Sequence, residues 1–222
     1  LKPYAVDRGR ITKLYQSRRA KPGALILGNS RPQMGLDPQH SCWPRSSEPV
    51  YNMALPGMSV YDQVRYAQHA MAYGDVSLTL VAVDFVDFLW EDPPAASATT
   101  WPPGGAAPSN EPFAVTPTGT RSPYAWQHRF RDYVEATLSL DALIHSLVTP
   151  ALQGTATTET LRPDGFHPAF RYYEPIVHTE GTNALFRQKN REMIRRLTGS
   201  SWHLYSPGTD TSPAFEALRH LL

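Results

Sequence analysis

The feature that most constrains this chain is a run of four apolar residues, 24–27, that passes directly into Gly28-Asn29-Ser30-Arg31. A short apolar run closed by a glycine predicts a buried strand that ends at the edge of a sheet. In open α/β sheets, ligands bind beyond the carboxyl ends of such strands. Ser30 therefore has two interpretations: it caps the helix that follows, or its hydroxyl faces a cleft as a nucleophile.

Further apolar segments alternate with helical patterns along the chain, an order that builds a parallel sheet with helices on both faces. The most apolar segment, 78–88, predicts a central strand that is buried on both faces. The predicted fold class is α/β, a three-layer α/β/α arrangement with a mainly parallel sheet. The other predicted elements are strands at 50–55 and 202–205 and helices at 60–73, 124–148, 182–197 and 213–222.

The predicted organisation is an N-terminal arm or linker at 1–21 and a single α/β domain at 22–222. The arm is polar and basic, which favours a solvated lead-in over a short amphipathic helix. Residues 91–123 form a long insert rich in proline and glycine, which is typical of a functional loop. Aromatic residues such as Trp101 and Phe113 either line a cleft or anchor this insert on the body, and we favour the anchor. In the helix at 182–197 we expect Phe186, Met193 and Ile194 to face inward.

Composition excludes several classes of function. The formal net charge of +1 gives no electrostatic argument for a nucleic-acid partner. A single cysteine, Cys42, excludes an internal disulfide. The sequence has neither metal-ligand spacing nor a phosphate-binding glycine motif, so we expect no metal and no cofactor. The chain starts at Leu1 and contains no apolar run of membrane-spanning length, which leaves a membrane anchor upstream of Leu1 as an open expectation.

The predicted strands bring Ser30, Gly57 and Asp84 to one edge of the sheet. Cleavage of an ester requires a nucleophilic hydroxyl, a base, a group that orients the base, and N–H donors for the oxyanion. Ser30 can supply the hydroxyl, and the Gly57 N–H can approach an oxyanion without obstruction by a Cβ atom. His167 follows Asp164 by three residues in a tight Gly/Pro turn, so one loop carries both an imidazole and a carboxylate.

Two neighbours of Ser30 are candidate binding residues. Asn29 is expected to hold the turn. Arg31 is a candidate ligand for a substrate carboxylate or phosphate, and an ordinary surface salt bridge is the alternative that we favour for it.

Four segments carry a resemblance to a known family: LILGNSR with the following MGLDP, YNMALPG, VAVDF and RPDGFHP. In these segments the chain resembles the SGNH (GDSL-like) hydrolase superfamily, and more narrowly its bacterial exported or membrane-anchored members associated with acylation of envelope polysaccharides. The resemblance implies a flavodoxin-like fold, Ser30 as the nucleophile and Gly57 as an oxyanion donor. It also implies His167 as the base and Asp164 as its partner, and a periplasmic or exported location.

The sequence departs from the family pattern in two places. Asp84 lies in the block that usually supplies an asparagine to the oxyanion hole, and an ionised carboxylate there repels a developing oxyanion. The D-x-x-H block usually lies near the end of the domain, whereas this chain continues from His167 to Leu222. The alternative is a catalytic Asp/His pair beyond Leu222 in a longer protein.

Two functions follow from these observations. The first is a serine esterase or O-acyltransferase that acts on acyl esters of a carbohydrate, or on another small ester, through an acyl-Ser30 intermediate. The acyl group is expected to be acetyl. The second is a catalytically incomplete module of the same fold that binds glycan or assists assembly in an envelope polysaccharide system. For the first function, aromatic residues in and beside the insert, such as Trp90 and Tyr124, are candidates for stacking on sugar rings.

Overall fold

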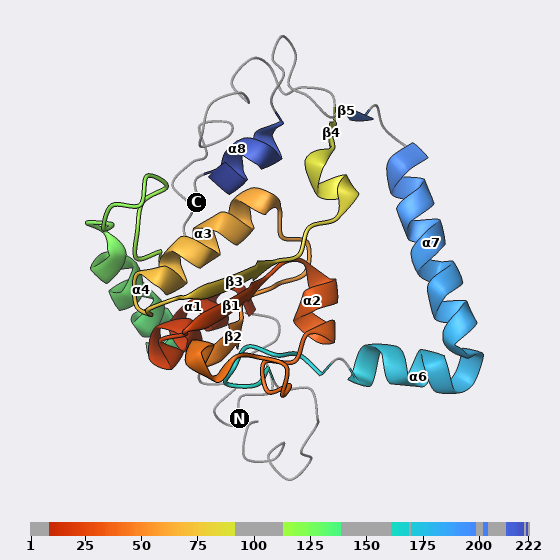
Figure 1. Cartoon of the computed structure of the whole chain (residues 1–222), viewed down its shortest axis with the longest axis horizontal. Coiled ribbons are helices and arrows are strands. Elements are labelled where there is room, and N and C mark those ends of the chain that lie inside the picture. The colour runs from red at the N-terminus through yellow and green to blue at the C-terminus, as the bar shows by residue number, and fades with distance from the viewer. Residues whose placement is uncertain are drawn as a thin grey trace.

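The computed structural model describes residues 9–91, 113–138, 161–168, 170–198, 202–203, 212–219 and 221. These residues form a mixed α/β fold with a small parallel sheet (Figure 1). The elements in chain order are α1 (Gly9–Ala20), β1 (Ala24–Leu27), α2 (Ser30–Gly35), the 3₁₀ helix η1 (Arg45–Ser47), β2 (Val50–Asn52), α3 (Val60–Met71), β3 (Leu78–Val81), the 3₁₀ helix η2 (Phe85–Phe88), β4 (Trp90–Glu91), α4 (Ala125–Leu138), α6 (Phe170–Glu180), α7 (Thr182–Thr198), β5 (Trp202–His203) and α8 (Pro213–Arg219).

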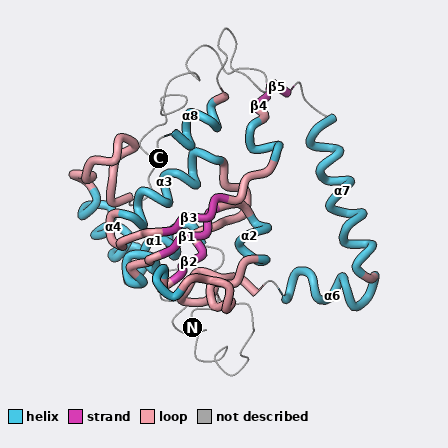
Figure 2. Tube along the Cα trace, in the orientation of Figure 1, coloured by secondary structure: helices cyan, strands magenta, loops and turns pink. Residues whose placement is uncertain are grey.

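The main sheet has the strand order β2-β1-β3, and both pairs are parallel. Figure 2 shows the three short strands side by side. Ala24 is in register with Val50 on one side and with Leu78 on the other, so the carboxyl ends of all three strands meet at one edge. A second, two-stranded sheet pairs β4 with β5 in antiparallel orientation. Within the described helices, none has the length and the apolar run that crossing a membrane requires.

All four side chains of β1 are fully buried, and they alternate between two apolar clusters. Leu25 and Leu27 pack on the face covered by α1 and α3, where burial stabilises the fold by about 1.5–3 kcal/mol for each leucine. Ala24 and Ile26 face the opposite cluster, which Leu36 and other loop residues complete. In the described residues that second face is covered by the segment after α2 rather than by a helical layer.

The prediction for residues 78–88 is wrong in two respects. β3 is an edge strand of the described sheet, with Leu78 37% exposed, and β1 takes the central place. The strand also ends at Val81, because the next residues turn into η2. There the Asp84 N–H donates to Asp87 Oδ2 at 2.7 Å, and the Asp87 N–H donates to the Asp84 carbonyl at 2.9 Å. These local hydrogen bonds compete with strand pairing.

The expectation of a solvated lead-in is wrong for residues 9–20, which form α1. This helix buries Leu14 together with the polar residues Lys13 and Ser17. Lys13 Nζ donates to the carbonyl oxygens of Asn52 at 2.8 Å and Ala54 at 2.5 Å, and burial lowers the pKa of Lys13 well below its ordinary value. The hydrophobic pattern gave this helix only as the alternative that we did not favour, because much of its buried face is polar.

The helices α3 and α7 match the predicted ranges closely, and α4 matches over the described part of 124–148. The helix α8 begins at Pro213 as predicted but ends at Arg219, before the predicted end at 222. Ser59 caps α3 in a reciprocal capping box with Asp62. The inward orientation expected in α7 is wrong for Phe186 and Ile194, which are 62% and 59% exposed. α7 packs against α6, and together the two helices stand apart from the sheet (Figure 1).

Phe113 anchors the end of the long insert, as predicted, and it is 6% exposed. Its ring packs edge-on against Tyr66, and the Arg65 guanidinium lies over it at 4.6 Å. His69 also holds this segment, because its Nδ1 accepts the N–H of Ala114, the residue after Phe113, at 3.0 Å. The Nε2 of His69 donates to the Leu14 carbonyl at 3.0 Å. Because one ring nitrogen accepts and the other donates, this arrangement requires a neutral imidazole. Trp101 lies outside the described residues.

We predict that His69 makes stability fall with acidification. Burial, opposed in part by the bond to Leu14, lowers its pKa from 6.5 to about 4, and the positive charges of Arg65, Arg18 and Arg129 act in the same direction as burial. The unfolded imidazole gains its proton at higher pH than the folded one. The His69 contribution is therefore complete above about pH 6.5 and decreases by about 3 kcal/mol as pH falls to 4. Urea unfolding of wild type and His69→Gln across this range should give a smaller pH slope for the variant. Equal slopes would contradict the assignment.

We predict that Gly165→Ala destabilises the protein strongly. Gly165 has φ +80°, and an added Cβ would overlap the carbonyl oxygen of Asn52. Gly119 has φ +81° with open space around an added Cβ, so Gly119→Ala is the matched control. The control should cost about 1–2 kcal/mol for backbone strain alone. Gly165→Ala should cost roughly 1–3 kcal/mol more, as overpacking does. Chemical denaturation measures both, and equal losses would show that the contact is unimportant.

Candidate functional site

The carboxyl edge of the sheet brings three loops together. The Leu55 N–H donates to the Gly28 carbonyl at 3.1 Å, and the Ala82 N–H donates to the Leu27 carbonyl at 3.0 Å. Gly28 has φ +148°, and a side chain there would overlap the Pro32 ring and crowd the Ala82 carbonyl. A glycine at position 28 therefore lets the loops after β1 and β3 approach each other closely.

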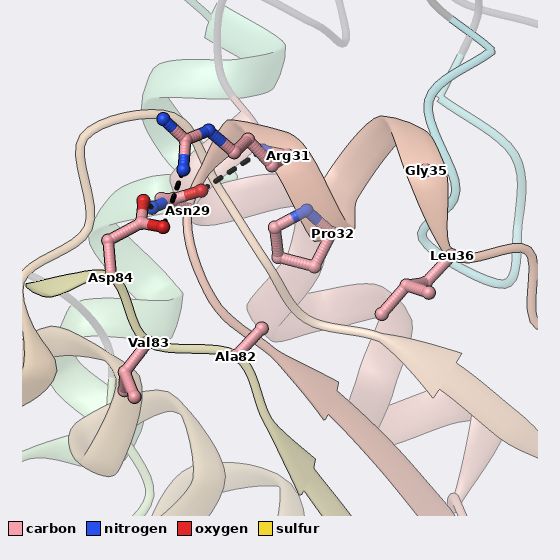
Figure 3. Close-up of a pocket in the computed structure, with 8 residues that line it drawn as sticks. All are labelled: Asn29, Arg31, Pro32, Gly35, Leu36, Ala82, Val83 and Asp84. Atoms are coloured by element: carbon pink, nitrogen blue, oxygen red, sulfur yellow. Dashed lines mark hydrogen bonds and ion pairs between the residues drawn. The ribbon is translucent and has the colours of Figure 1, made fainter. Parts of the chain in front are cut away.

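A polar cluster of Asn29, Arg31 and Asp84 lies at this edge (Figure 3). Arg31 Nη1 donates to Asp84 Oδ1 at 2.5 Å, and Asn29 Nδ2 donates to Asp84 Oδ2 at 2.7 Å. Asn29 Oδ1 accepts the Arg31 backbone N–H at 3.0 Å. The Arg31 side chain is 65% exposed, which leaves most of its guanidinium accessible. The salt bridge that we favoured for Arg31 is therefore confirmed, with Asp84 as the partner.

The polar cluster forms one end of an open pocket of about 300 Å³ between α2 and the segment after β3. The other lining residues are small or apolar: Pro32, Gly35, Leu36, Ala82 and Val83. None of these five residues was predicted from the sequence as a site residue. Their positions in the sequence could have indicated them, because they lie within a few residues of Ser30 or Asp84, at the ends of predicted strands.

Ser30 is the first residue of α2, directly after the β1 turn, and it is partly exposed. The interpretation of Ser30 as the helix cap is wrong, because Asn29 occupies the N-cap position and its side chain accepts the Arg31 N–H. No hydrogen bond joins the Ser30 hydroxyl to another described residue. Ser30 is not among the residues that line the pocket, although its two neighbours are.

Gly57 lies two residues after Leu55, on the loop that the Leu55–Gly28 hydrogen bond holds beside the turn after β1. It is exposed, and it does not line the pocket. Among the described residues its backbone N–H has no acceptor.

Asp164 belongs to a segment, 161–168, that lies beside β2: its carbonyl accepts the Asn52 N–H at 2.8 Å. Its carboxylate accepts hydrogen bonds from Gln39 Nε2 at 3.0 Å, from the Phe166 N–H at 3.1 Å and from the Arg162 guanidinium. Arg162 also bonds both oxygens of Asp37, which holds the pKa of Asp37 below its ordinary value. Within the described residues, no hydrogen bond joins the Asp164 carboxylate to His167.

His167 is 2% exposed, and its backbone N–H donates to the Gln33 carbonyl at 3.3 Å. Gln33 follows Ser30 by three residues in α2, so the two lie on the same face of that helix. The loop with Asp164 and His167 is thus packed beside the helix that begins at Ser30. Asn52 reinforces this arrangement, because its buried Nδ2 donates to the Pro32 and Leu36 carbonyls at 2.9 Å each.

The described residues contain no group of three or more His, Cys, Asp or Glu side chains that could hold a metal ion. No family model, no curated protein and no solved structure shows significant similarity to this chain. The class that the described residues define is a mixed α/β protein with a parallel β2-β1-β3 sheet and a largely apolar pocket, with a polar cluster at one end, at its carboxyl edge.

We predict that Asn29→Ala destabilises the protein and that Ser30→Ala does not. Asn29→Ala removes the cap of α2 and a hydrogen bond to Asp84, which should cost about 1–2 kcal/mol. Ser30→Ala removes a hydroxyl that bonds no described residue, so the change should stay within about 0.5 kcal/mol. Thermal and urea denaturation of both variants measure the difference. A large loss in Ser30→Ala would show that the hydroxyl has a structural role.

Proposed function

We propose that this protein is an SGNH-type serine esterase or O-acyltransferase that acts on acetyl or other acyl esters of a carbohydrate through an acyl-Ser30 intermediate. The observation that carries the proposal is the position of Ser30. Ser30 follows the central strand at the carboxyl edge of a parallel sheet, and it is partly exposed. Its side chain does not cap α2, because Asn29 occupies the N-cap position. The proposal includes a three-layer SGNH fold: the parallel β2-β1-β3 sheet and the helices α1 and α3 on one face support it, although the described residues cover the other face with the segment after α2.

In the proposed reaction, Ser30 Oγ attacks the carbonyl carbon of the ester while its proton passes to the His167 imidazole. The tetrahedral oxyanion accepts hydrogen bonds from the backbone N–H groups of Ser30 and Gly57. When the C–O bond breaks, the imidazolium returns the proton to the departing sugar oxygen. Water then takes the acyl group in hydrolysis, or a second sugar hydroxyl takes it in transfer. The packing of the His167 segment against α2 supports the role of His167, and the exposure of Gly57, whose N–H bonds no described residue, supports the role of Gly57.

Asp84 stands where the family pattern has an oxyanion donor, and we assign it a different role. Its two carboxylate oxygens accept hydrogen bonds from Arg31 and Asn29, and the guanidinium offsets its charge. Asp84 therefore holds these two residues beside Ser30, and the backbone N–H groups are left to bind the oxyanion.

The second candidate is a catalytically incomplete module that binds glycan or assists assembly. The observation that favours it is the Asp164 carboxylate, which bonds Arg162, Gln39 and the Phe166 N–H instead of an imidazole. Ser30 also lies outside the lining of the pocket. Under either function we propose a periplasmic or exported location, an inference that rests on the family resemblance.

We predict that a fluorophosphonate probe labels the wild-type protein and that the protein turns over p-nitrophenyl acetate. Ser30→Ala should abolish labelling and lower turnover by roughly 10³-fold or more. Ser46→Ala is the control, because Ser46 is an exposed serine in η1, before β2, and should label and react as wild type. Mass spectrometry of the labelled peptide and a chromogenic assay make the measurements.

The acyl-serine mechanism would be contradicted if the wild-type protein were neither labelled by the fluorophosphonate nor able to turn over the ester. Unchanged labelling and turnover in Ser30→Ala would contradict it as well. Glycan binding that survives Ser30→Ala, in a protein without turnover, would establish the second candidate.

A further inference from the structure

The helix α7 concentrates positive charge on the surface of the protein. Its sequence carries five Lys and Arg residues and one Glu, a net charge of +4, whereas the whole chain has a formal net charge of +1. Four of its described basic side chains are exposed: Arg187, Lys189, Arg191 and Arg195. Glu192 pairs with Lys189 at 3.0 Å, so the acidic residue of the helix offsets a single positive charge. An anionic partner is therefore attracted to this helix.

The same helix exposes apolar side chains. Phe186 is 62% exposed and Ile194 is 59% exposed, while Met193 and Leu197 are half-buried. Because an α-helix has 3.6 residues per turn, positions 186, 193 and 197 lie in one narrow sector of the helix, and position 194 lies at its edge. Positions 187 and 191 continue beyond 194 on that side, and position 189 borders the sector on the other side. Basic residues therefore flank an exposed apolar stripe.

Two other described helices share one of these properties each. α4 exposes Trp126 and Phe130, at 61% and 66%, but its sequence balances two Arg residues with one Asp and one Glu. α1 has four basic residues and no acidic residue, but its Lys13 is fully buried and its Leu14 packs in the core. An excess of positive charge and an exposed apolar stripe coincide in α7.

The charge of α7 disfavours a second copy of the chain as its partner. Two copies that packed on their apolar stripes would bring their arginines together, and like charges repel each other. A stable protein interface takes about 20–30 residues from each partner. α7 has 17 residues, and with α6 it stands apart from the sheet (Figure 1). A soluble acidic polymer would pair with the arginines and leave Phe186 and Ile194 in water.

An anionic lipid surface satisfies both halves of this helix face. Lipid phosphates accept charge-assisted hydrogen bonds from arginine, and the boundary between headgroups and acyl chains accepts apolar side chains. A helix of 17 residues is about 25 Å long, so the exposed apolar residues and the arginines beside them can reach one flat surface together.

We propose that α7 docks the protein on an anionic lipid bilayer as an interfacial helix that lies in the plane of the membrane surface. Phe186, Met193 and Ile194 enter the boundary between headgroups and acyl chains. Arg187 and Arg191 contact the lipid phosphates. The proposal stands on the charge and the exposed side chains of α7, and it requires neither the acyl-Ser30 mechanism nor the family resemblance.

The test is co-sedimentation of the full chain with lipid vesicles at low ionic strength. Vesicles of phosphatidylglycerol and phosphatidylcholine in equal parts should bind the protein at least about 25-fold more tightly than pure phosphatidylcholine vesicles, because each arginine near an anionic surface contributes roughly fivefold. High salt should weaken this binding, since it screens the charges. Equal binding to both kinds of vesicle, or binding to neither, would overturn the proposal.

Two variants of α7 separate charge from apolar contact. Arg187→Gln combined with Arg191→Gln should lower the partition constant for the anionic vesicles by about 25-fold. Phe186→Ala should lower it by roughly fivefold to tenfold, through the loss of apolar burial. All three side chains are exposed, so the circular dichroism spectra should match that of the wild-type protein.

Matched variants elsewhere on the surface are the controls. Arg18→Gln combined with Arg19→Gln makes the same charge change at two exposed positions of α1. Phe130→Ala removes a ring that is as exposed as Phe186 from α4, which lies on the other side of the sheet from α7 (Figure 1). Both controls should bind the anionic vesicles as the wild-type protein does. Controls that weaken binding as much as the α7 variants do would overturn the assignment to α7.

Two further outcomes would replace the lipid surface by another partner. Binding of polyglutamate as tight as vesicle binding, and unchanged in Phe186→Ala, would identify an acidic macromolecule as the partner. Sedimentation velocity that shows a dimer in the absence of vesicle binding, and a monomer in Phe186→Ala, would identify a second copy of the chain.

Discussion

The site depends on one buried side chain, Asn52, at the end of β2. It is fully buried, and its amide group donates to the carbonyls of Pro32 and Leu36, which fixes the carboxyl end of α2. Its backbone N–H donates to Asp164, and its carbonyl accepts from Lys13 Nζ. One residue thereby joins α1, α2, β2 and the segment 161–168. Buried polar groups cost stability unless they are hydrogen-bonded, so this network specifies one arrangement of the loops around the sheet edge.

Parallel pairing places the three strand ends side by side, and the residues after each strand complete the edge. The turn after β1 supplies Asn29, Ser30 and Arg31, and the turn after β3 supplies Asp84. Pairing of Arg31 with Asp84 offsets a carboxylate that would otherwise oppose an oxyanion, and it lies at one end of a pocket beside a partly exposed serine. The same interaction therefore bears on the proposed acyl transfer.

Short sequence patterns predicted the elements whose formation depends mainly on neighbouring residues. The apolar run before Gly28 gave β1, and Ser59 with Asp62 marked the start of α3. The hydrophobic pattern gave wrong predictions for helices whose buried face is polar and for helices whose apolar residues are exposed. α1 buries Lys13 and Ser17, which sequence patterns assign to solvent, and α7 exposes Phe186 and Ile194. For β3, apolar content predicted a central strand, but strand order is decided by which partners pair, and hydropathy does not encode that choice.

The sequence alone determined that Asn29, Ser30 and Arg31 follow a buried strand, because a short apolar run that ends at a glycine is compatible with few other secondary structures. Only the tertiary structure decided that Asn29 rather than Ser30 caps α2, that Asp84 lies against Arg31, and that the Asp164 carboxylate bonds Arg162 and Gln39. Each of these choices involves hydrogen-bond partners that compete for the same donors, many of them far apart in the chain. Which partners form the hydrogen bond depends on their distance in the folded structure, and the spacing of the residues along the sequence does not give that distance.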